Sequence, residues 1–356
     1  MRIGLLSYPM LFQRTGGLQV QVRETLAALR ALGADADFMN PWTQALTDFD
    51  VIHLFGAING NERIIEACND AGVPVVLSSV LHPPFGRADA RRARTAAALA
   101  GRLTDWASTT SYRQVMTALH GADRVVALGR RERDMLVDGY EVPAERLRVI
   151  PNGVPERFFK ASPDLFERAH GAPRPFLITA ASISPYKNQL AVIRALAMLD
   201  AEVDYVMFGR VAREHRDYLR ECLAAGGDRV RYLGELVYDD PMLPSAYAAA
   251  SILALPSLSE VMPLCVLEAM ACGTPAVMTT RHGMDVAPSR GMLMEVEPTD
   301  KRALSRAIGA LLAVRAPRAA VRCEVEAYSW TAVARQVMDV YAELVPGKAE
   351  AGSVAG

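Results

Sequence analysis

The chain has little of several features that would mark common classes of protein. Among its 356 residues there are only five cysteines, an odd number, and no pair has the spacing of a metal site. We interpret them as small buried residues in a reducing compartment. No apolar run of about 18 residues occurs, which argues against a membrane-spanning helix. The formal net charge of −1 argues against nucleic acid as the main partner. The cysteines are Cys68, Cys222, Cys265, Cys272 and Cys323.

Lysine is also scarce, and no secretory leader is predicted. The first residues, MRIGLLSYPM, are interrupted too soon for a signal peptide, so we expect a cytoplasmic protein. Lysine occurs only at Lys160, Lys187, Lys301 and Lys348, and arginine supplies the other basic side chains. A lysine inside a motif therefore draws attention, and Lys187 is the one that lies in such a position.

Apolar runs alternate with helical patterns through most of the chain. A composition of 51% hydrophobic and 22% charged residues is ordinary for a globular protein. We expect buried parallel strands near residues 2–7, 51–54, 73–77, 125–128, 148–154, 176–178, 205–208, 230–233, 251–255 and 276–278. Helices are expected near residues 18–32, 62–71, 131–138, 189–199, 215–225, 264–272, 304–312 and 331–344.

The proline-containing stretch 155–175 separates two such series, and we place the linker between domains there. The pattern predicts an α/β protein with two doubly wound, Rossmann-like parallel sheets, in domains 1–155 and 156–330. Ligands of such sheets bind at the carboxyl ends of the strands, so we expect the domains to face a cleft that holds the site. The small, polar tail 346–356 is expected to be frayed.

The most informative stretch is SLSEVMPLCVLEAMACGTPAV, residues 257–277. Pro263 is well placed as the first residue of a helix that ends before Gly273 and Pro275. The first-turn N–H groups near Leu264, Cys265 and Val266 could then face an anion.

Glu268 is nearly the only charge of this helix, eight positions after Glu260. Buried there, its carboxylate needs a partner such as a ligand rich in hydroxyl groups, for example a ribose. The alternative is that Glu268 faces water on an amphipathic helix.

This segment resembles the E-x7-E motif of retaining glycosyltransferases of family 4, which have the GT-B fold. The matching positions are Glu260, Pro263, Leu264, Glu268, Ala269, Met270, Ala271, Gly273 and Pro275. The resemblance implies a nucleotide-diphosphate sugar as donor, with Glu260 holding hydroxyl groups of the sugar and Glu268 the ribose. It also implies that the last helix, 331–345, packs back on the first domain.

Three further positions resemble donor-binding parts of the same family. The pair Gly16-Gly17, between the first strand and the first helix, is similar to a glycine pair whose backbone approaches the donor phosphates. Glycine would allow that approach and a positive φ; a plain turn is the alternative. Gly209 lies in a loop that, by resemblance, borders the nucleotide.

Lys187 matches the lysine of the family pattern that opens a helix after the first strand of the second domain. An ammonium group beside a diphosphate would stabilise the charge that grows as the sugar bond breaks. The arginine of that pattern falls on Ser182 here, so one of two usual cations is missing. Arg210 is a candidate replacement. The alternative for Lys187 is a solvated residue at the start of a helix.

Two histidines follow expected strands. The family often has a histidine at the position of His82, facing the donor sugar, and His53 also has a family counterpart. A histidine at a strand end is often structural, and we favour a functional role for His82 and a structural one for His53.

Two other patterns invite competing interpretations. Asp35-Ala36-Asp37 is a D-x-D string of the kind that binds metal in another fold, but it precedes an expected strand, so we expect no metal and no cofactor. Residues 87–102, from Arg87 to Arg102, are rich in arginine and low in acid. They could form a basic helix that contacts anionic lipid at the inner membrane face. A solvated helix is the equally supported alternative.

Together these observations predict a metal-independent, retaining hexosyltransferase. It would use a UDP- or GDP-linked sugar and a saccharide or lipid-linked acceptor. The resemblance implies that the departing phosphate takes the acceptor proton. Two rivals stay open, a sugar-nucleotide epimerase on the same fold and a binding module without turnover. The second is motivated by Ser182.

Overall fold

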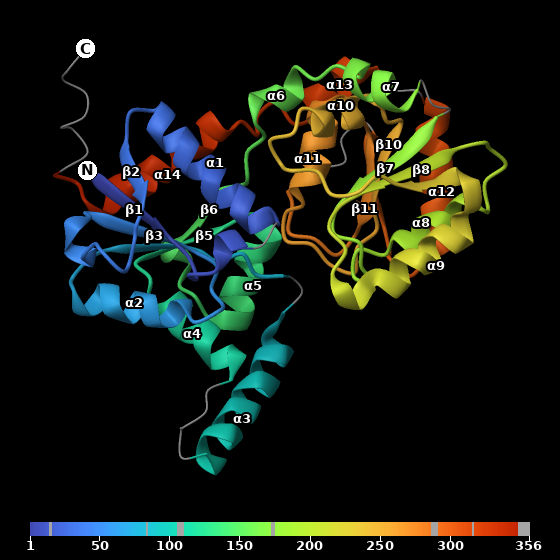
Figure 1. The fold of residues 1–356 in the computed structure, drawn as a ribbon. Helices are drawn as coiled ribbons and strands as arrows, with labels where there is room; N and C mark the ends of the chain where they lie inside the picture. Colours follow the sequence, from blue (N-terminus) through green and yellow to red (C-terminus); the bar gives the residue numbers. More distant parts are fainter. Residues whose placement is uncertain are drawn as a thin grey trace. The chain divides into compact units, whose positions relative to one another are not determined.

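The structure, a computed structural model, describes residues 1–13, 16–82, 85–104, 110–171, 175–285, 291–314 and 317–347. The chain divides into two compact units (Figure 1). Unit 1 comprises Met1–Gly153, Gly283–Asp285 and Trp330–Gly356, and unit 2 comprises Val154–His282 and Val286–Ser329.

Unit 1 is built on a six-stranded parallel sheet in the order β2-β1-β3-β4-β5-β6. Its strands are β1 (Arg2–Leu6), β2 (Asp35–Phe38), β3 (Val51–Phe55), β4 (Val75–Ser78), β5 (Arg124–Ala127) and β6 (Leu147–Val149). Its helices are α1 (Gly17–Ala31), α2 (Asn61–Asp70), α3 (Arg87–Leu103), α4 (Ser111–Gly121), α5 (Arg130–Tyr140) and α14 (Trp330–Leu344). Helices α1 and α14 pack together on one face, and α2, α4 and α5 lie on the other (Figure 1).

Unit 2 repeats this plan with a second six-stranded parallel sheet in the order β12-β11-β10-β7-β8-β9. Its strands are β7 (Phe176–Ala180), β8 (Asp204–Phe208), β9 (Val230–Tyr232), β10 (Ile252–Leu255), β11 (Ala276–Thr279) and β12 (Leu293–Val296). Its helices are α6 (Glu156–Phe159), α7 (Asp164–His170), α8 (Gln189–Leu196), α9 (Arg216–Gly226), α10 (Met242–Ala249), α11 (Leu264–Ala271), α12 (Lys301–Val314) and α13 (Arg318–Cys323). Helices α8, α9 and α12 form one layer, and α10 and α11 pack together in another.

Short 3-10 turns complete both units. They are η1 (Leu11–Gln13), η2 (Leu46–Asp48), η3 (Ala144–Arg146), η4 (Arg213–His215) and η5 (Gly227–Arg229). The central strands are buried along their whole length, as β3, β4, β10 and β11 show. Such continuous burial is what a parallel sheet covered by helices on both faces requires.

The strand order places a topological switch point in each sheet. In unit 1 the order reverses between β1 and β3, and in unit 2 it reverses between β7 and β10. At such a point the loops after the two central strands diverge to opposite faces and leave a crevice outside their carboxyl ends. The loops after β7 and β10 are therefore the first place to look for a ligand site in unit 2.

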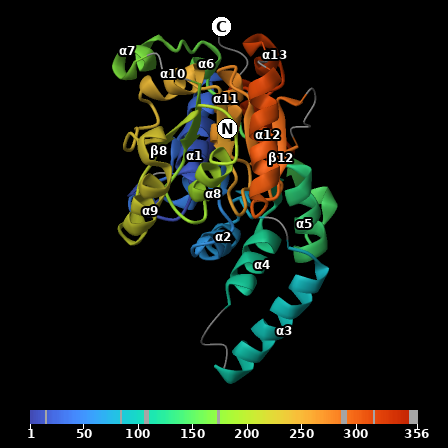
Figure 2. The ribbon, with the colours of Figure 1, turned by 90° about the vertical axis from the view of Figure 1, so that its right-hand side faces the viewer.

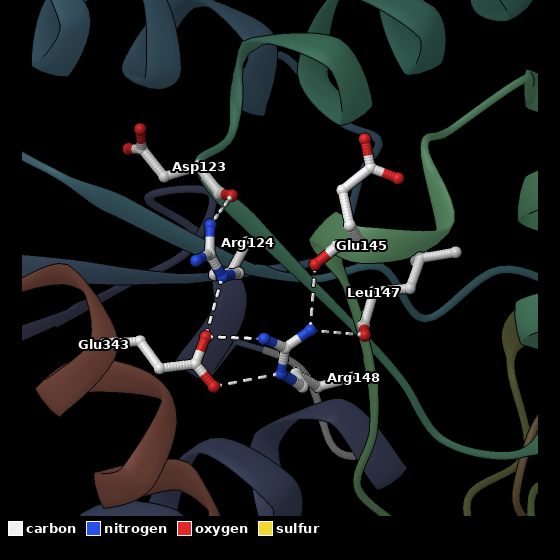
Figure 3. Close-up of polar contacts among 6 residues, drawn as sticks. All are labelled: Asp123, Arg124, Glu145, Leu147, Arg148 and Glu343. Carbon is white, nitrogen blue, oxygen red and sulfur yellow. Dashed lines mark hydrogen bonds and ion pairs between the residues drawn. The ribbon is translucent and has the colours of Figure 1, made fainter.

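The C-terminal helix α14 is fastened to the sheet of unit 1 by charged side chains at the opposite, amino-terminal edge of the strands (Figure 3). The Glu343 carboxylate accepts hydrogen bonds from Arg148 on β6, at 2.6 and 3.1 Å, and from Arg124 on β5, at 2.9 Å. Arg148 and then Arg124 hold the pKa of Glu343 below its usual value. This cluster lies away from the carboxyl edge, so we interpret it as structural.

The two parallel, doubly wound sheets predicted from the sequence are confirmed. Both sheets have edge strands, β2 and β12, that the sequence reading omitted, and Asp35 to Asp37 lie within β2 rather than before a strand. Chain boundaries between units fall at Gly153 and Val154, and at Ser329 and Trp330. The limits of independently folding domains stay a prediction. Most of the expected frayed tail, residues 348–356, lies outside the described residues.

Candidate functional site

Lys187 lies in the loop after β7, at the switch point of unit 2. A turn closed by the Lys187 N–H and the Ser184 carbonyl, at 3.0 Å, precedes α8. The next residue, Asn188, has a φ of 61° and donates its side-chain amide to the carbonyls of Pro256 and Pro298, each at 3.0 Å. These two carbonyls belong to the loops that follow β10 and β12. The turn is therefore hydrogen-bonded to the loops after β10 and β12, which fixes the backbone from which the Lys187 side chain extends.

Glu260 lies opposite Lys187, in the loop after β10. The Lys187 Nζ and the Glu260 Oε1 are 2.5 Å apart, and their side chains are only 21% and 9% exposed. The backbone N–H of Glu260 donates to the carbonyl of Arg281, in the loop after β11, at 2.8 Å. Residues 73 positions apart in the chain are thus brought together as a cation and an anion at the carboxyl edge of the sheet.

Helix α11 begins four residues after Glu260. Leu264 is its first residue, as in the expected helix 264–272, and Pro263 is the N-cap residue rather than the first helical residue. The N–H of Val266 bonds to the Pro263 carbonyl at 3.2 Å, so it is not available to an anion as expected. The amides of Leu264 and Cys265 remain as donors that have no partner within the helix. Burial raises the pKa of the Cys265 thiol, which keeps it neutral beside Glu260.

The structure buries Glu268, with 3% of the residue exposed, which excludes the water-facing alternative. The Tyr247 hydroxyl donates to Glu268 Oε2 at 3.5 Å, a long hydrogen bond. Burial, followed by the nearby Glu268 carboxylate, raises the pKa of Tyr247 well above its usual value, so the phenol stays protonated. A carboxylate in such apolar surroundings favours any ligand that brings hydroxyl donors to it.

The loop after β8 holds Gly209 and Arg210 beside the first part of the Lys187 loop. Gly209 has a φ of +144°, and a Cβ there would come within 1.9 Å of the Ala181 carbonyl oxygen. The backbone conformation and the close contact with Ala181 are therefore enough to explain why position 209 is a glycine, without any role in binding. Arg210 accepts a backbone hydrogen bond from Ile183 at 2.9 Å, which puts it alongside the exposed Ser182. The backbone of Arg210 thus lies beside Ser182, and Arg210 stays the candidate for the cation that is missing there.

A further pair of side chains at this edge was missed from the sequence. His282, which follows β11, is 2% exposed, and its Nε2 is hydrogen-bonded to the Glu295 carboxylate on β12. Arg281, the residue before it, is bonded to Glu297 at 2.5 Å and accepts the N–H of Glu260. These two contacts fix the loop that holds the backbone of Glu260. A histidine directly after a buried strand was the available signal.

In unit 1, the predicted Gly16-Gly17 turn lies after β1, also at a switch point. Gly16 is the N-cap of α1 with φ 168° and ψ 176°, which is extended backbone that other residues adopt. The expected need for a positive φ is therefore wrong here. A Cβ on Gly16 would lie 3.1 Å from the Gln19 side-chain oxygen, so space is limited only by a side chain that can move.

His82 is exposed and follows β4, two positions after a strained residue. Val80 has a φ of +50°, a conformation that β-branched residues rarely adopt. The residues on either side of Val80 are both hydrogen-bonded to the buried carboxylate of Glu132 on α5. Ser79 donates its hydroxyl to Glu132 at 2.6 Å, and Leu81 donates its N–H at 2.8 Å. Glu132 thus fixes the turn that presents His82, a role that the sequence did not reveal.

Glu132 accepts a third hydrogen bond, at 2.7 Å, from the N–H of Leu128, just before its own helix. Burial raises the pKa of Glu132, and the three donors oppose that rise by favouring the charged form. The position of Glu132 in the first turn of α5 also favours a negative charge.

His53 has a structural environment, as favoured from the sequence. It is 1% exposed, with Nδ1 2.7 Å from the Tyr341 hydroxyl of α14 and Nε2 2.9 Å from Ser78 Oγ. The cavity beside it has space for about one water molecule, too little for a sugar nucleotide. Burial lowers the pKa of His53 to about 3, so the ring is neutral at physiological pH.

This burial predicts a pH dependence of stability. The folded-state pKa of about 3 lies below the unfolded value of about 6.5, so His53 weakens the folded state as the pH falls from 6.5 towards 3. The slope from one such group is about 1.4 kcal/mol per pH unit. Urea unfolding of His53→Gln across this range should show a flatter pH dependence than the original chain. Parallel curves would contradict the assignment.

The remaining expectations concern metals, membranes and cysteines. Among the described residues, no group of three or more His, Cys, Asp and Glu side chains is arranged to hold a metal ion. Within the same ranges, no helix is long and apolar enough to cross a bilayer. The cysteines are not uniformly buried as expected, since Cys265 is half-buried and Cys323 is exposed.

Known structures share this arrangement of two sheets. Sucrose-phosphate synthase from Thermosynechococcus elongatus matches with a TM-score of 0.76 at 18% identity, over 98% of this chain and 100% of the other. HepE of Anabaena in complex with UDP-glucose matches with a TM-score of 0.71 at 17% identity, over 96% and 100%. The fold is that of the GT-B glycosyltransferases.

Sequence comparison then gives the family. The model for "Glycosyl transferases group 1" matches residues 174–314, and that for "Glycosyltransferase Family 4" matches residues 38–158. The chain belongs to the glycosyltransferases of family 4. D-inositol 3-phosphate glycosyltransferase of Salinispora tropica is 33% identical over 252 residues, 63% of this chain and 52% of the relative. The chain spans about half the length of the curated relatives that it matches first.

Proposed function

We propose that the protein is a retaining hexosyltransferase that takes its sugar from a nucleotide-diphosphate donor, with UDP as the first nucleotide to test. The observation that carries this proposal is the Lys187–Glu260 pair beside the start of α11, at the switch point between β7 and β10. There a cation and a buried carboxylate lie beside the first-turn amides of α11, the helix that also carries the buried Glu268. Family membership and the UDP-glucose complex of HepE support the same choice.

In this proposal each residue has one task. Lys187 and the amides of Leu264 and Cys265 hold the diphosphate, since a helix N-terminus favours negative charge. Glu260 accepts hydrogen bonds from hydroxyl groups of the sugar. Glu268 accepts them from the ribose, which supplies the donors that its buried carboxylate favours.

The chemical step needs no dedicated base. The acceptor hydroxyl attacks the anomeric carbon on the face from which the diphosphate leaves, and a departing phosphate oxygen takes the hydroxyl proton. Lys187 stabilises the charge that accumulates on that oxygen as the sugar bond breaks. His82 of unit 1 is assigned to the donor sugar, and Gly16 and Gly17 to the donor phosphates. These assignments rest on the family resemblance and on positions after β4 and β1.

The acceptor is a saccharide or a lipid-linked saccharide. Some relatives are named D-inositol 3-phosphate glycosyltransferases. A phosphorylated cyclitol should therefore be included among the acceptors that are tested. We keep a cytoplasmic location in the proposal.

The decisive experiment incubates the protein with UDP- and GDP-hexoses, alone and with acceptors, and follows release of nucleotide diphosphate. NMR of the product should show the anomeric configuration of the donor retained. Tight donor binding without release of nucleotide, with every acceptor, would instead support the binding module that Ser182 suggested. An isomeric sugar nucleotide as the product would support the epimerase.

The two glutamates should be separable by calorimetry with bare UDP. Glu268→Gln keeps the volume and removes the charged acceptor, and a charged hydrogen bond is worth about 1.5–3 kcal/mol, so UDP should bind roughly 10- to 150-fold more weakly. Glu260→Gln should leave UDP affinity unchanged or raise it, because Lys187 loses the carboxylate 2.5 Å away. It should lower turnover of the sugar nucleotide. Equal losses of UDP affinity in both variants would show that the roles are assigned wrongly.

A further inference from the structure

Helix α3 extends away from the sheet of unit 1 in both views (Figures 1 and 2). Its inner side is held by two ion pairs to α5 and the residue that follows it. Arg87 pairs with Asp138 at 2.8 Å, and Arg94 pairs with Glu141 at 2.6 Å. These contacts account for two of the arginines on the helix and leave its other side turned to solvent.

The outer face of α3, which we define as Arg91, Arg92, Leu99, Arg102 and Leu103, combines three cations with two exposed leucines. Leu99 and Leu103 are 59% and 77% exposed. Helical geometry places Arg92 in line with both leucines, since spacings of seven and eleven residues return to about the same side. Arg91 and Arg102, also eleven positions apart, lie together about a quarter turn to one side of that line. All three arginines are exposed.

Acidic side chains offset only part of the positive charge of α3. The sequence of α3 contains five arginines and one acid, Asp89, in a chain whose net charge is −1. Asp89 accepts the N–H of Gly86 at the start of the helix, at 3.1 Å, and lies 4.0 Å from the guanidinium of Arg92. Among the described residues, no ion pair is recorded for Arg91 or Arg102. Three of the five arginines thus face an acid, and the helix keeps a local excess of positive charge.

We propose that the outer face of α3 binds the surface of a bilayer that contains anionic lipid. Guanidinium groups recognise lipid phosphates, while leucines between them enter the boundary between headgroups and acyl chains. Nucleic acid offers the same phosphates but no apolar layer for Leu99 and Leu103. The combination of charge and leucine therefore favours lipid. This proposal does not depend on the transferase activity, and its test uses no sugar nucleotide.

The test is sedimentation of the full chain with two kinds of vesicle, one of phosphatidylcholine alone and one that also contains about 30% phosphatidylglycerol. We expect binding only to the anionic vesicles, weakening as salt is raised. Replacing Arg91, Arg92 and Arg102 with Gln should lower the partition coefficient about fivefold for each arginine. Leu99→Ser together with Leu103→Ser should lower it as well, without changing its salt dependence.

The control variant carries the same loss of charge elsewhere. Arg216, Arg302 and Arg306 are exposed on α9 and α12 of unit 2, and their replacement with Gln should leave vesicle binding unchanged. Equal losses in the two triple variants would mean that overall charge, not α3, sets the binding. Absence of binding to anionic vesicles at low salt would overturn the proposal. So would binding to a DNA duplex that is equally strong and insensitive to the leucine changes.

Discussion

Replacing Lys187 with alanine is expected to lower kcat by about 10²- to 10³-fold or more, the usual cost of removing one preorganised electrostatic donor. Two features of the structure raise that expectation. The side chain is 21% exposed and is supported by a turn bonded to two neighbouring loops, so its charge is held in place. The arginine usual in the family is replaced by Ser182, which leaves Lys187 with a larger share of the phosphate charge.

The loss of activity in Lys187→Ala should also have a second cause, the carboxylate that is left without its cation. Without Lys187, the carboxylate of Glu260 stays at the site with a side chain only 9% exposed and no cation 2.5 Å away. A diphosphate arriving there would meet an uncompensated negative charge. Adding Glu260→Gln to Lys187→Ala should therefore restore part of the UDP affinity, though not the turnover. A double variant with lower affinity than Lys187→Ala alone would contradict this coupling.

Lys160→Ala is the matched control for this experiment. Lys160 also pairs with a glutamate of unit 2, Glu156, at 2.6 Å, but both side chains are more than two-thirds exposed. Its loss should leave kcat unchanged, because exposed pairs contribute little. Lys187→Arg should recover only part of the activity, since a planar guanidinium does not replace a compact ammonium. Near-full turnover in Lys187→Ala would place the cation elsewhere, with Arg210 the first candidate.

The central strands could be predicted because burial on both faces demands continuous apolar runs. The runs at residues 251–255 and 276–278 became β10 and β11 with small changes at their ends. The edge strands β2 and β12 were not predicted. One side of each has no neighbouring strand, which permits polar sequences such as DADF and LMEV. Neither looks like a buried strand. The order of the strands, and with it the switch points, could not be deduced from apolar patterns.

The site was only partly visible for a related reason. The motif at 257–277 pointed to Glu260 and Glu268, but no local signal joined Glu260 to a lysine 73 positions away. Only the resemblance suggested that they share a site. For Val266 the sequence predicted a free N–H, but the structure bonds it to the Pro263 carbonyl. Whether an N–H is bonded inside the first turn depends on backbone geometry, which residue types do not determine.

Glu132 was overlooked because it looks like a surface charge. It stands in the stretch RRERD at the start of a helix, where acidic and basic residues usually face water. The donors that reveal its role come from Ser79 and Leu81, about 50 residues earlier in the chain, and from Leu128. A buried carboxylate with three donors is visible only once the loop after β4 and the start of α5 are placed side by side.

The loss of Glu132 is expected to be among the most destabilising single changes in unit 1. Glu132→Ala leaves the buried N–H groups of Leu81 and Leu128 without their acceptor, and each such group costs about 1–3 kcal/mol, whereas the Ser79 hydroxyl keeps the Val126 carbonyl at 3.2 Å. We expect a decrease of at least about 2 kcal/mol in the free energy of unfolding, measured in urea. Glu145→Ala, on the exposed turn before β6, should change it by no more than about 0.5 kcal/mol.

Glu132→Gln tests the positioning role in a variant that should still fold. The amide retains one oxygen acceptor, so one of the three donors faces an NH₂ group, and the turn around Val80 should loosen without collapse. If that turn presents His82 to the donor sugar, kcat should fall, as it should in His82→Ala. Affinity for bare UDP should be unchanged, because Glu132 and His82 are assigned no contact with the nucleotide. A kcat equal to that of the original chain would leave Glu132 with a purely structural role, and weaker UDP binding would contradict the assignment of His82 to the sugar alone.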